Sequence, residues 1–237
     1  MRNAVICLPT YNERENLEAM LRALAPLGVR VLVIDDNSPD GTGEIADRLA
    51  AELDFVSVLH RTHKEGLGPA YLAGFQRALA DGADYVLEMD CDFSHDPADV
   101  PRLIAACESG ADLALGSRYV DGGGTENWGL TRRLVSAGGS FYARALLGVR
   151  LRDLTGGFKC YRRAVLERID LGAIRSKGYA FQIEGTYRTL RAGFTVVEVP
   201  IRFVDRTAGH SKMSRTIFLE AVARVPALRF AALRNRL

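Results

Sequence analysis

The chain has 237 residues, of which 48% are hydrophobic and 25% charged, and its formal net charge at pH 7 is +2. This composition is typical of a soluble globular chain of one or two domains; low-complexity tracts and internal repeats are absent, and no apolar run approaches the ~20 residues of a membrane-spanning helix. The four cysteines are scattered, which favours free thiols in a reducing cytoplasm over a disulfide framework or a zinc site.

Apolar, strand-like runs alternate with amphipathic, helix-like segments along the first half of the chain. Strand-like runs cover 4–9, 29–36, 55–61, 84–90 and 111–118, and helix-like segments cover 15–27, 43–53, 69–80 and about 98–108. Such alternation with short connections predicts βαβ units. The expected fold is therefore α/β, with a mostly parallel sheet that has helices on both faces.

Polar segments follow four of these strands. They are PTYNE at 9–13, DDNSPDGT at 35–42, DCD at 90–92 and GSR at 116–118. In an open α/β sheet, ligands bind beyond the carboxyl ends of the strands. We therefore expect a ligand site where these three acid-bearing segments and one arginine converge.

Two common nucleotide-binding motifs are missing from the sequence. No G-x-G-x-x-G follows the first strand, and no Walker-type GxxxxGK[ST] is present. The glycines of GLGPAYLAG, at 66–74, follow the third strand and indicate a turn into a helix with Pro69 at its first position. A dinucleotide-dependent dehydrogenase and a P-loop enzyme are both disfavoured.

Asp90 and Asp92 stand one residue apart at the end of the fourth strand. If the chain stays extended there, both carboxylates lie on the same face. Two such charges repel each other unless a cation or a donor lies between them. The pair therefore indicates either a metal site or a strand that simply ends in solvent.

The segments above, with Gly66-Leu67-Gly68 and the later stretches DLTGGFKCYRR, GYAFQIE and VVEVPIRFVDRTAGHSKM, resemble glycosyltransferase family 2 over residues 3 to 216. Within that family they resemble the dolichol- or polyprenol-phosphate mannosyltransferase branch. The resemblance implies a GT-A-like, Rossmann-type fold with a catalytic domain at 1–210. It also implies transfer of mannose from GDP-mannose to a polyprenyl monophosphate, with inversion at the anomeric carbon.

The resemblance assigns residues to the donor site. The nucleotide sugar is expected to contact Pro9, Tyr11, Glu13, Ile34, Asp36, Asp90, Cys91, Arg206 and Lys212. Hard oxygen ligands suit Mg²⁺ or Mn²⁺, and a divalent ion neutralises a departing diphosphate. The expected metal ligands are Asp90, Asp92 and Ser94.

A catalytic set completes these expectations: Asp92, Arg118, Arg132 and Ser136. We expect the two arginines near the acceptor phosphate, with Arg133 pointing away from it. Because a phosphate monoester has its second pKa near ~6, the acceptor is largely a dianion at neutral pH and requires no protein base.

Two alternatives remain open on the sequence alone. A polyprenyl-phosphate hexosyltransferase that uses a UDP-sugar would need the same residues. A non-catalytic module that binds anionic lipid would need only the basic C-terminal part. Nucleic acid is disfavoured as a partner, because the basic residues are not interleaved with stacking aromatics.

The C-terminal part of the chain is basic. Residues 202–236 contain eight Lys or Arg and two acids, a net charge of +6, which leaves −4 for the rest. We expect residues 211–237 to form a basic amphipathic helical tail, kinked or interrupted at Pro226. The tail either lies on an anionic membrane surface or packs on the domain.

These features predict where the protein works. The N-terminal residues MRNAVICLP lead directly into a strand and do not form a signal peptide. We therefore expect a cytoplasmic protein, peripheral on the inner face of the cytoplasmic membrane. A separate membrane-embedded partner chain is a further expected way of anchoring it.

Overall fold

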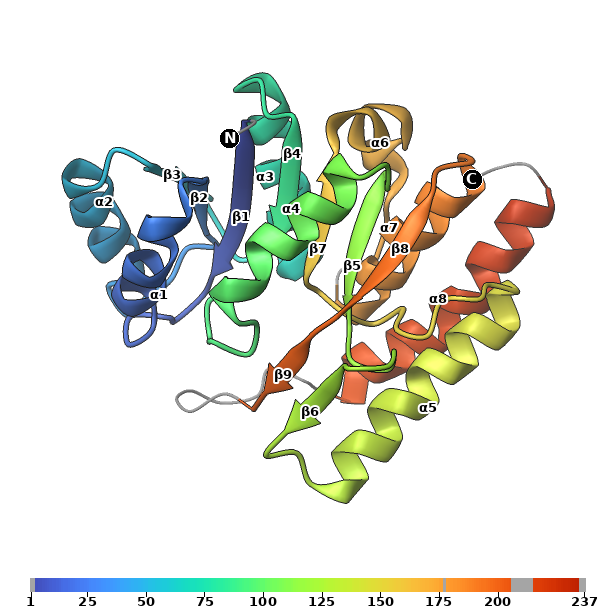
Figure 1. The fold of residues 1–237 in the computed structure, drawn as a ribbon. Helices are drawn as coiled ribbons and strands as arrows, with labels where there is room; N and C mark the ends of the chain where they lie inside the picture. Colours follow the sequence, from blue (N-terminus) through green and yellow to red (C-terminus); the bar gives the residue numbers. More distant parts are fainter. Residues whose placement is uncertain (1–2, 177, 206–214, 235–237) are drawn as a thin grey trace.

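The structure is a computed structural model that describes residues 3–176, 178–205 and 215–234. Its centre is a seven-stranded sheet in the order β3-β2-β1-β4-β7-β5-β8 (Figure 1). The strands are β1 (Ala4–Thr10), β2 (Arg30–Asp35), β3 (Val56–His60), β4 (Tyr85–Glu88), β5 (Leu113–Ser117), β7 (Lys159–Arg162) and β8 (Val196–Pro200). All neighbouring pairs are parallel except those of β7, which is antiparallel to both β4 and β5.

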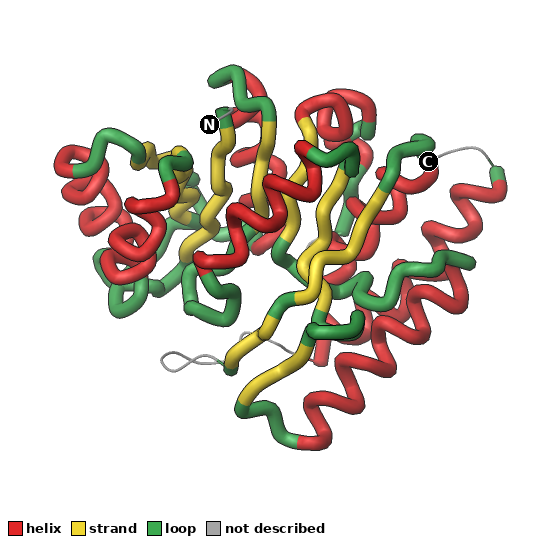
Figure 2. Tube along the Cα trace, in the orientation of Figure 1, coloured by secondary structure: helices red, strands yellow, loops and turns green. Residues whose placement is uncertain are grey.

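Helices cover both faces of this sheet, as the alternating pattern predicts (Figure 2). Along β1, Ile6 and Leu8 pack on one face against α1 (Leu17–Leu24), α2 (Thr42–Glu52) and α4 (Val100–Glu108). Val5 and Cys7 pack on the other face against α3 (Leu67–Ala80), α6 (Arg163–Arg168) and α7 (Tyr179–Arg191). Because alternate residues of a strand point to opposite faces, the sheet has a separate hydrophobic core on each face.

Helix α3 lies very close to the sheet at Gly74. A Cβ atom at this position would lie 2.4 Å from Cδ1 of Ile34 and 3.1 Å from Sγ of Cys7. Only a residue without a side chain fits there without displacing its neighbours. The close approach fixes the height of α3 above β1 and β2, and with it the loop that precedes α3.

A third core joins the long helices α5 (Leu130–Leu147) and α8 (Arg215–Leu233) to α7 (Figure 1). From α8, Val225, Leu228 and Ala232 are buried in it. A small parallel pair, β6 (Gly124–Glu126) with β9 (Arg202–Val204), lies near the start of α5. The described part of the tail therefore packs on the domain.

The expected elements up to residue 118 are all present, with ends that differ by a few residues. Helix α3 begins at Leu67 after Gly66, so Pro69 is not at its first position. Pro226 lies inside α8, which continues through it and is not interrupted. None of the helices among the described residues combines the length and the apolar character that crossing a bilayer requires.

Candidate active site

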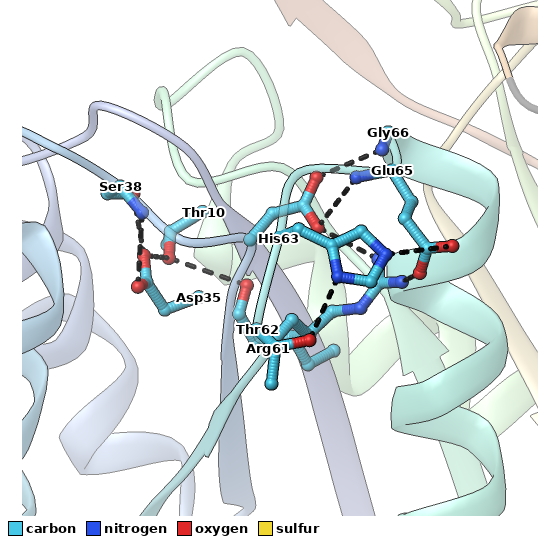
Figure 3. Close-up of polar contacts among 10 residues, drawn as sticks. Thr10, Asp35, Ser38, Arg61, Thr62, His63, Glu65 and Gly66 are labelled. Carbon is cyan, nitrogen blue, oxygen red and sulfur yellow. Dashed lines mark hydrogen bonds and ion pairs between the residues drawn. The ribbon is translucent and has the colours of Figure 1, made fainter.

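The segment after β2 folds into two polar turns. The buried carboxylate of Asp35 accepts hydrogen bonds from the Ser38 hydroxyl at 2.6 Å and from the Thr10 hydroxyl at 3.4 Å (Figure 3). Asp40 accepts from the backbone N–H and the hydroxyl of Thr42 at 3.0 and 2.6 Å. Burial opposes ionisation of Asp40, but the hydrogen bonds from Thr42 outweigh it and lower the pKa of this carboxyl.

Asp36 ties the end of β2 to the loop before α3. Its carboxylate, which is buried, accepts from the guanidinium of Arg61 at 2.9 Å and from the N–H groups of Glu65 and Gly66 at 3.3 and 3.0 Å. Arg61 also pairs with the carboxylate of Glu65 (Figure 3). The sequence predicts nucleotide contacts for Asp36, and in the structure its main partners are this loop.

The same loop places a cation over the expected base-binding aromatic. The ammonium of Lys64 lies 3.6 Å from the ring centroid of Tyr11. Tyr11, Glu13 and Pro9 are all half-buried at the end of β1. The N–H of Glu13 donates to the Thr42 hydroxyl at 3.0 Å, which joins this segment to the turn after β2.

Two residues expected to contact the nucleotide have buried side chains. The side chain of Ile34 is fully buried beneath α3, against Gly74. Strand alternation turns this side chain into the core of the sheet, so contact between Ile34 and a nucleotide would have to be made by its backbone. Cys91 is also buried and packs in the core on the opposite face.

Asp90 and Asp92 do not lie on an extended strand. Strand β4 ends at Glu88, and the next residues form a tight turn in which Phe93 has a φ of 59°. The condition under which strand alternation would place both carboxylates on one face is therefore not met. Within the turn, Asp92 is buried and accepts from the N–H of Ser94 at 3.1 Å, while Asp90 is half-buried and accepts from the hydroxyl of Tyr71 at 3.5 Å.

The oxygen atoms of this turn fit a hard divalent cation. The hydroxyl of Ser94 is buried and has no hydrogen-bond partner among the described residues. It lies in the same turn as the two carboxylates, and three oxygens of this kind suit Mg²⁺ or Mn²⁺. In the described part of the chain no three His, Cys, Asp or Glu side chains form a metal cluster, so further ligands would have to come from substrate and water.

His95 packs against the turn that carries Asp90 and Asp92. Burial lowers the pKa of His95 to about 4, so its ring is neutral at pH 7. Its Nδ1 accepts from the N–H of Asp90 at 3.2 Å, and its ring stacks on Phe158 with centroids 4.9 Å apart. The ring thus fixes the start of the turn that contains Asp90, Asp92 and Ser94, which we call the acidic turn.

Arg118, at the end of β5, is held by a buried carboxylate. Its Nε and one terminal nitrogen each donate to Asp153 at 2.7 Å, and the same terminal nitrogen donates to the Thr155 hydroxyl at 2.8 Å. Burial opposes ionisation of Asp153, but the attraction of Arg118 outweighs it and lowers the pKa of that carboxyl. The guanidinium is therefore fixed in direction.

Arg132 and Ser136 lie one turn apart on α5. Arg132 pairs with Asp205 at 2.5 Å, and its guanidinium carbon lies 4.3 Å from the ring centroid of Trp128. The hydroxyl of Tyr119 donates to Ser136 at 2.8 Å. Arg133 is exposed and donates to the carbonyl of Thr125, away from this group. Arg206 and Lys212 lie outside the described residues.

The sequence profile of glycosyl transferase family 2 matches residues 5–170, which contain the acidic turn, Arg118, Arg132 and Ser136. This chain belongs to glycosyltransferase family 2. It is 51% identical to the polyprenol monophosphomannose synthase of Mycolicibacterium smegmatis, over 94% of this chain and 86% of that protein. It is also 51% identical to the undecaprenyl-phosphate mannosyltransferase of Micrococcus luteus, over 97% of each.

The fold agrees with this assignment. A crystal structure of glucosyl-3-phosphoglycerate synthase from Mycobacterium tuberculosis, in complex with Mn²⁺ and UDP-glucose, matches 99% of this chain and 79% of its own, with a TM-score of 0.67 and 21% identity. A second structure of that enzyme, in complex with phosphoglyceric acid, gives a TM-score of 0.65. The chain is therefore a glycosyltransferase with the expected GT-A-like fold.

Sequence reasoning missed three residues around the site of this glycosyltransferase. Lys64 is in a charged loop, and its position over Tyr11 depends on the packing of α3. Asp153 is 35 positions from Arg118, so no local spacing reveals the pair. Trp128 is the only tryptophan of the chain and stands close to Arg132 and Arg133 in the sequence, and of the three residues it alone gave a signal that could have been used.

Proposed function

We propose that this glycosyltransferase moves mannose from GDP-mannose to a polyprenyl monophosphate, with inversion, and that the reaction depends on a divalent metal. The observation that carries this proposal is the 51% identity, over almost the whole chain, to two proteins named for mannosyl transfer to polyprenyl phosphates. The arrangement of an acidic turn and two fixed arginines in one chain supports the same reaction.

The donor occupies the ends of β1, β2 and β4. The nucleobase lies against the face of Tyr11 opposite Lys64, and Glu13 and Asp36 accept from base or ribose donors beside Pro9. Asp36 contributes in a second way, because it holds the loop that carries Lys64. The backbone around Ile34 and Cys91 forms the floor, and Arg206 and Lys212 complete the contacts to the diphosphate.

Asp90, Asp92 and Ser94 would hold Mg²⁺ or Mn²⁺. When bound, such an ion neutralises charge that develops on the diphosphate as it departs. The neutral ring of His95 and the N–H of Ser94 hold the two carboxylates in position for this task. Their mutual repulsion in the absence of a cation would then be relieved by the substrate complex.

The acceptor phosphate lies between Arg118, Arg132 and Ser136. One of its oxygens attacks the anomeric carbon, a new carbon–oxygen bond forms, and the bond from that carbon to the diphosphate breaks, releasing GDP. Since the phosphate is already anionic, the protein contributes position and charge instead of a base. Asp153, as the ionised partner of Arg118, keeps that guanidinium directed at the site.

The exposed face of α5 provides a membrane contact for a lipid acceptor. This helix carries Arg132, Arg133 and Arg144 and no acidic residue. Its exposed large apolar side chains are Leu130, Leu134, Val135, Phe141, Tyr142 and Leu146. An apolar patch beside positive charge fits the surface of an anionic membrane. We propose that α5 lies on the inner face of the cytoplasmic membrane, which places Arg132 and Ser136 next to the lipid headgroups.

One assay tests the reaction. Purified protein is incubated with Mn²⁺, undecaprenyl phosphate and a panel of radiolabelled nucleotide sugars. Label is expected in the lipid fraction with GDP-mannose. Label from a UDP-hexose alone would replace the donor in this proposal, and label from none would favour a non-catalytic lipid-binding module. The same assay with the acceptor in vesicles of pure lipid distinguishes the two modes of anchoring. Transfer on such vesicles indicates direct membrane contact, and its absence indicates that a membrane-embedded partner chain is needed.

A further inference from the structure

Trp128 occupies the turn between β6 and α5. It follows Asn127, which has a φ of 60°, and precedes Gly129, the residue before the first turn of α5. The indole is only 7% exposed, although its two neighbours in sequence are exposed. The local backbone therefore turns this one side chain inward, toward the arginines at the end of the sheet.

The faces and edges of the indole meet cations and aromatic rings. The guanidinium carbons of Arg132 and Arg118 lie 4.3 and 5.6 Å from its centroid. The ring of Phe203 meets it edge to face, with centroids 5.2 Å apart. Phe203 in turn contacts the ring of His95 at 5.3 Å. A continuous packed path thus connects Trp128 with the acidic turn.

The indole N–H is buried and has no acceptor among the described residues. A buried donor without a partner is costly, so such a group calls for an explanation. The charged groups that lie against the ring are guanidiniums, which are donors only. A ligand with several acceptor oxygens and negative charge would accept from the indole N–H and also be attracted by the two guanidiniums, which Asp153 and Asp205 hold beside the ring.

We propose that the indole N–H of Trp128 donates a hydrogen bond to a phosphate oxygen of the substrate, beside the guanidiniums of Arg132 and Arg118. The ligand chemistry is a phosphate group, either the monophosphate of the lipid acceptor or the diphosphate of the donor. Trp128 is then a binding residue of the reaction proposed above, on which this inference rests. The positive N-terminal end of α5, next to the same turn, adds to the attraction for an anion.

The chain offers a clean optical probe because Trp128 is its only tryptophan. The fluorescence of the wild-type protein is titrated separately with geranyl monophosphate, GDP and inorganic phosphate. A saturable change in indole emission is expected with geranyl phosphate or with GDP, at much lower concentration than with inorganic phosphate. The change is expected to be lost in Arg132→Ala. No change with any of the three would overturn the proposal.

Two substitutions distinguish the contribution of the indole N–H from that of the aromatic ring. Trp128→Phe keeps an aromatic face for Arg132 and removes the donor, and Trp128→Leu removes both. Losing one hydrogen bond to a charged group should raise KM for one substrate about tenfold in Trp128→Phe, with kcat nearly unchanged. If KM rises for the lipid phosphate, the acceptor is the source of the phosphate; if it rises for the nucleotide sugar, the donor is. Wild-type KM values for both substrates in Trp128→Phe would assign the ring to packing alone and refute the hydrogen bond.

A nearly isosteric replacement covers the case in which Trp128→Phe does not fold. Because the chain has one tryptophan, incorporation of benzothienylalanine in its place changes only this residue and replaces the N–H by sulfur. The same rise in KM is expected, with an unchanged melting temperature. If no sugar is transferred by any form of the protein, the reaction proposal fails, and the fluorescence titration still decides whether Trp128 binds phosphate.

Discussion

Arg118 and Asp153 face each other through two hydrogen bonds of 2.7 Å, with the carboxylate fully buried and the guanidinium almost so. Removing one member of a buried pair leaves an unpaired charge, which costs roughly 3–5 kcal/mol. For this reason Arg118→Ala would test folding more than catalysis. Arg118→Lys keeps the charge but loses the fork geometry.

We expect Arg118→Lys to lower the transfer rate with polyprenyl phosphate by more than about tenfold, because an ammonium cannot make both hydrogen bonds in the required plane. Steady-state rates measure the effect on transfer, and thermal melts measure the effect on the stability of the fold. Asp121→Asn, which removes the fully exposed partner of Arg152, is the matched control and should change neither. A wild-type rate in Arg118→Lys would show that the bidentate pair is irrelevant to catalysis.

Adjacent arginines on α5 provide a second test. Arg132→Ala should lower the rate with polyprenyl phosphate by more than about tenfold, since a charge-assisted contact to the acceptor is lost. Arg133→Ala should have little effect, because about 100° on the helix separates the two side chains. Initial rates at several lipid concentrations give the comparison. Equal losses in both variants would point to membrane attraction as the cause instead of a specific contact.

The acidic turn predicts how the metal requirement depends on single atoms. Asp92→Asn should abolish turnover with the fold intact, because a ligand charge is lost, while Asp90→Asn should be less severe. Ser94→Ala removes the hydroxyl that has no partner among the described residues, so it should weaken metal activation without lowering the melting temperature. Rates measured against Mn²⁺ concentration, with EDTA as the zero point, report these differences. Near wild-type activity of Asp92→Asn across the whole titration would remove this residue from the metal site.

The absence of a protein base predicts a simple pH dependence. At low prenyl phosphate concentration, the rate should fall about tenfold per pH unit below the second pKa of the phosphate, near ~6, because the dianion attacks. Two buried carboxylates outside the metal and nucleotide sites are already engaged: Asp153 by Arg118, and Glu184 by Arg188 and Ser176. Asp153→Asn and Glu184→Gln should keep the same apparent pKa, even where the rate is lower. A profile whose acidic limb disappears in either variant would identify that residue as the base.

The apolar face of α5 predicts a membrane contact that point variants can remove. Leu134 and Phe141 are 65% and 63% exposed, so their replacement costs the core little. Leu134→Ser with Phe141→Ser should reduce flotation with anionic liposomes, and the solution activity on a short, soluble prenyl phosphate should persist. Val222→Ser on α8, where the side chain is also exposed, is the control. Undiminished flotation of the double variant would exclude α5 as the contact.

Much of the sheet is readable in the sequence because its first five strands are short apolar runs bounded by turn residues. Strand β7 is different. It reads KCYR, and its first residue, Lys159, is fully buried 3.9 Å from the equally buried Glu88 of β4. A central strand that begins with a lysine contradicts the apolar pattern, and only its partners on other elements explain it: Glu88 and, on α7, Gln182, whose backbone carbonyl and side-chain amide oxygen accept from the ammonium at 2.9 and 2.5 Å. Burial lowers the pKa of Lys159 and raises that of Glu88, and their mutual attraction opposes both effects.

The site was predictable in its residue types but not in its backbone. The acids, arginines and Ser94 follow strand ends, which a sheet of this kind brings together. The direction of each acidic side chain was not predictable, because β4 ends at Glu88 and the chain bends from Cys91 on, so strand alternation does not extend to Asp90 and Asp92. Ile34 shows the converse case: strand β2 continues through it, so its side chain stays in the core.

The insertion of β7 between β4 and β5 sets the order in which the molecule assembles. Strands β4 and β5 follow each other along the chain, yet the strand that joins them, β7, is made only when residues 159–162 are synthesised, so that until then β4 can pair only with β1. Until then β4 presents an open edge, and Glu88 has no cation opposite it. Pairing over such long separations in sequence is slow. A nascent chain that already carries the entire acidic turn therefore exposes this edge, which is open to aggregation, until the strand that begins with Lys159 supplies both a neighbour for β4 and a cation for Glu88.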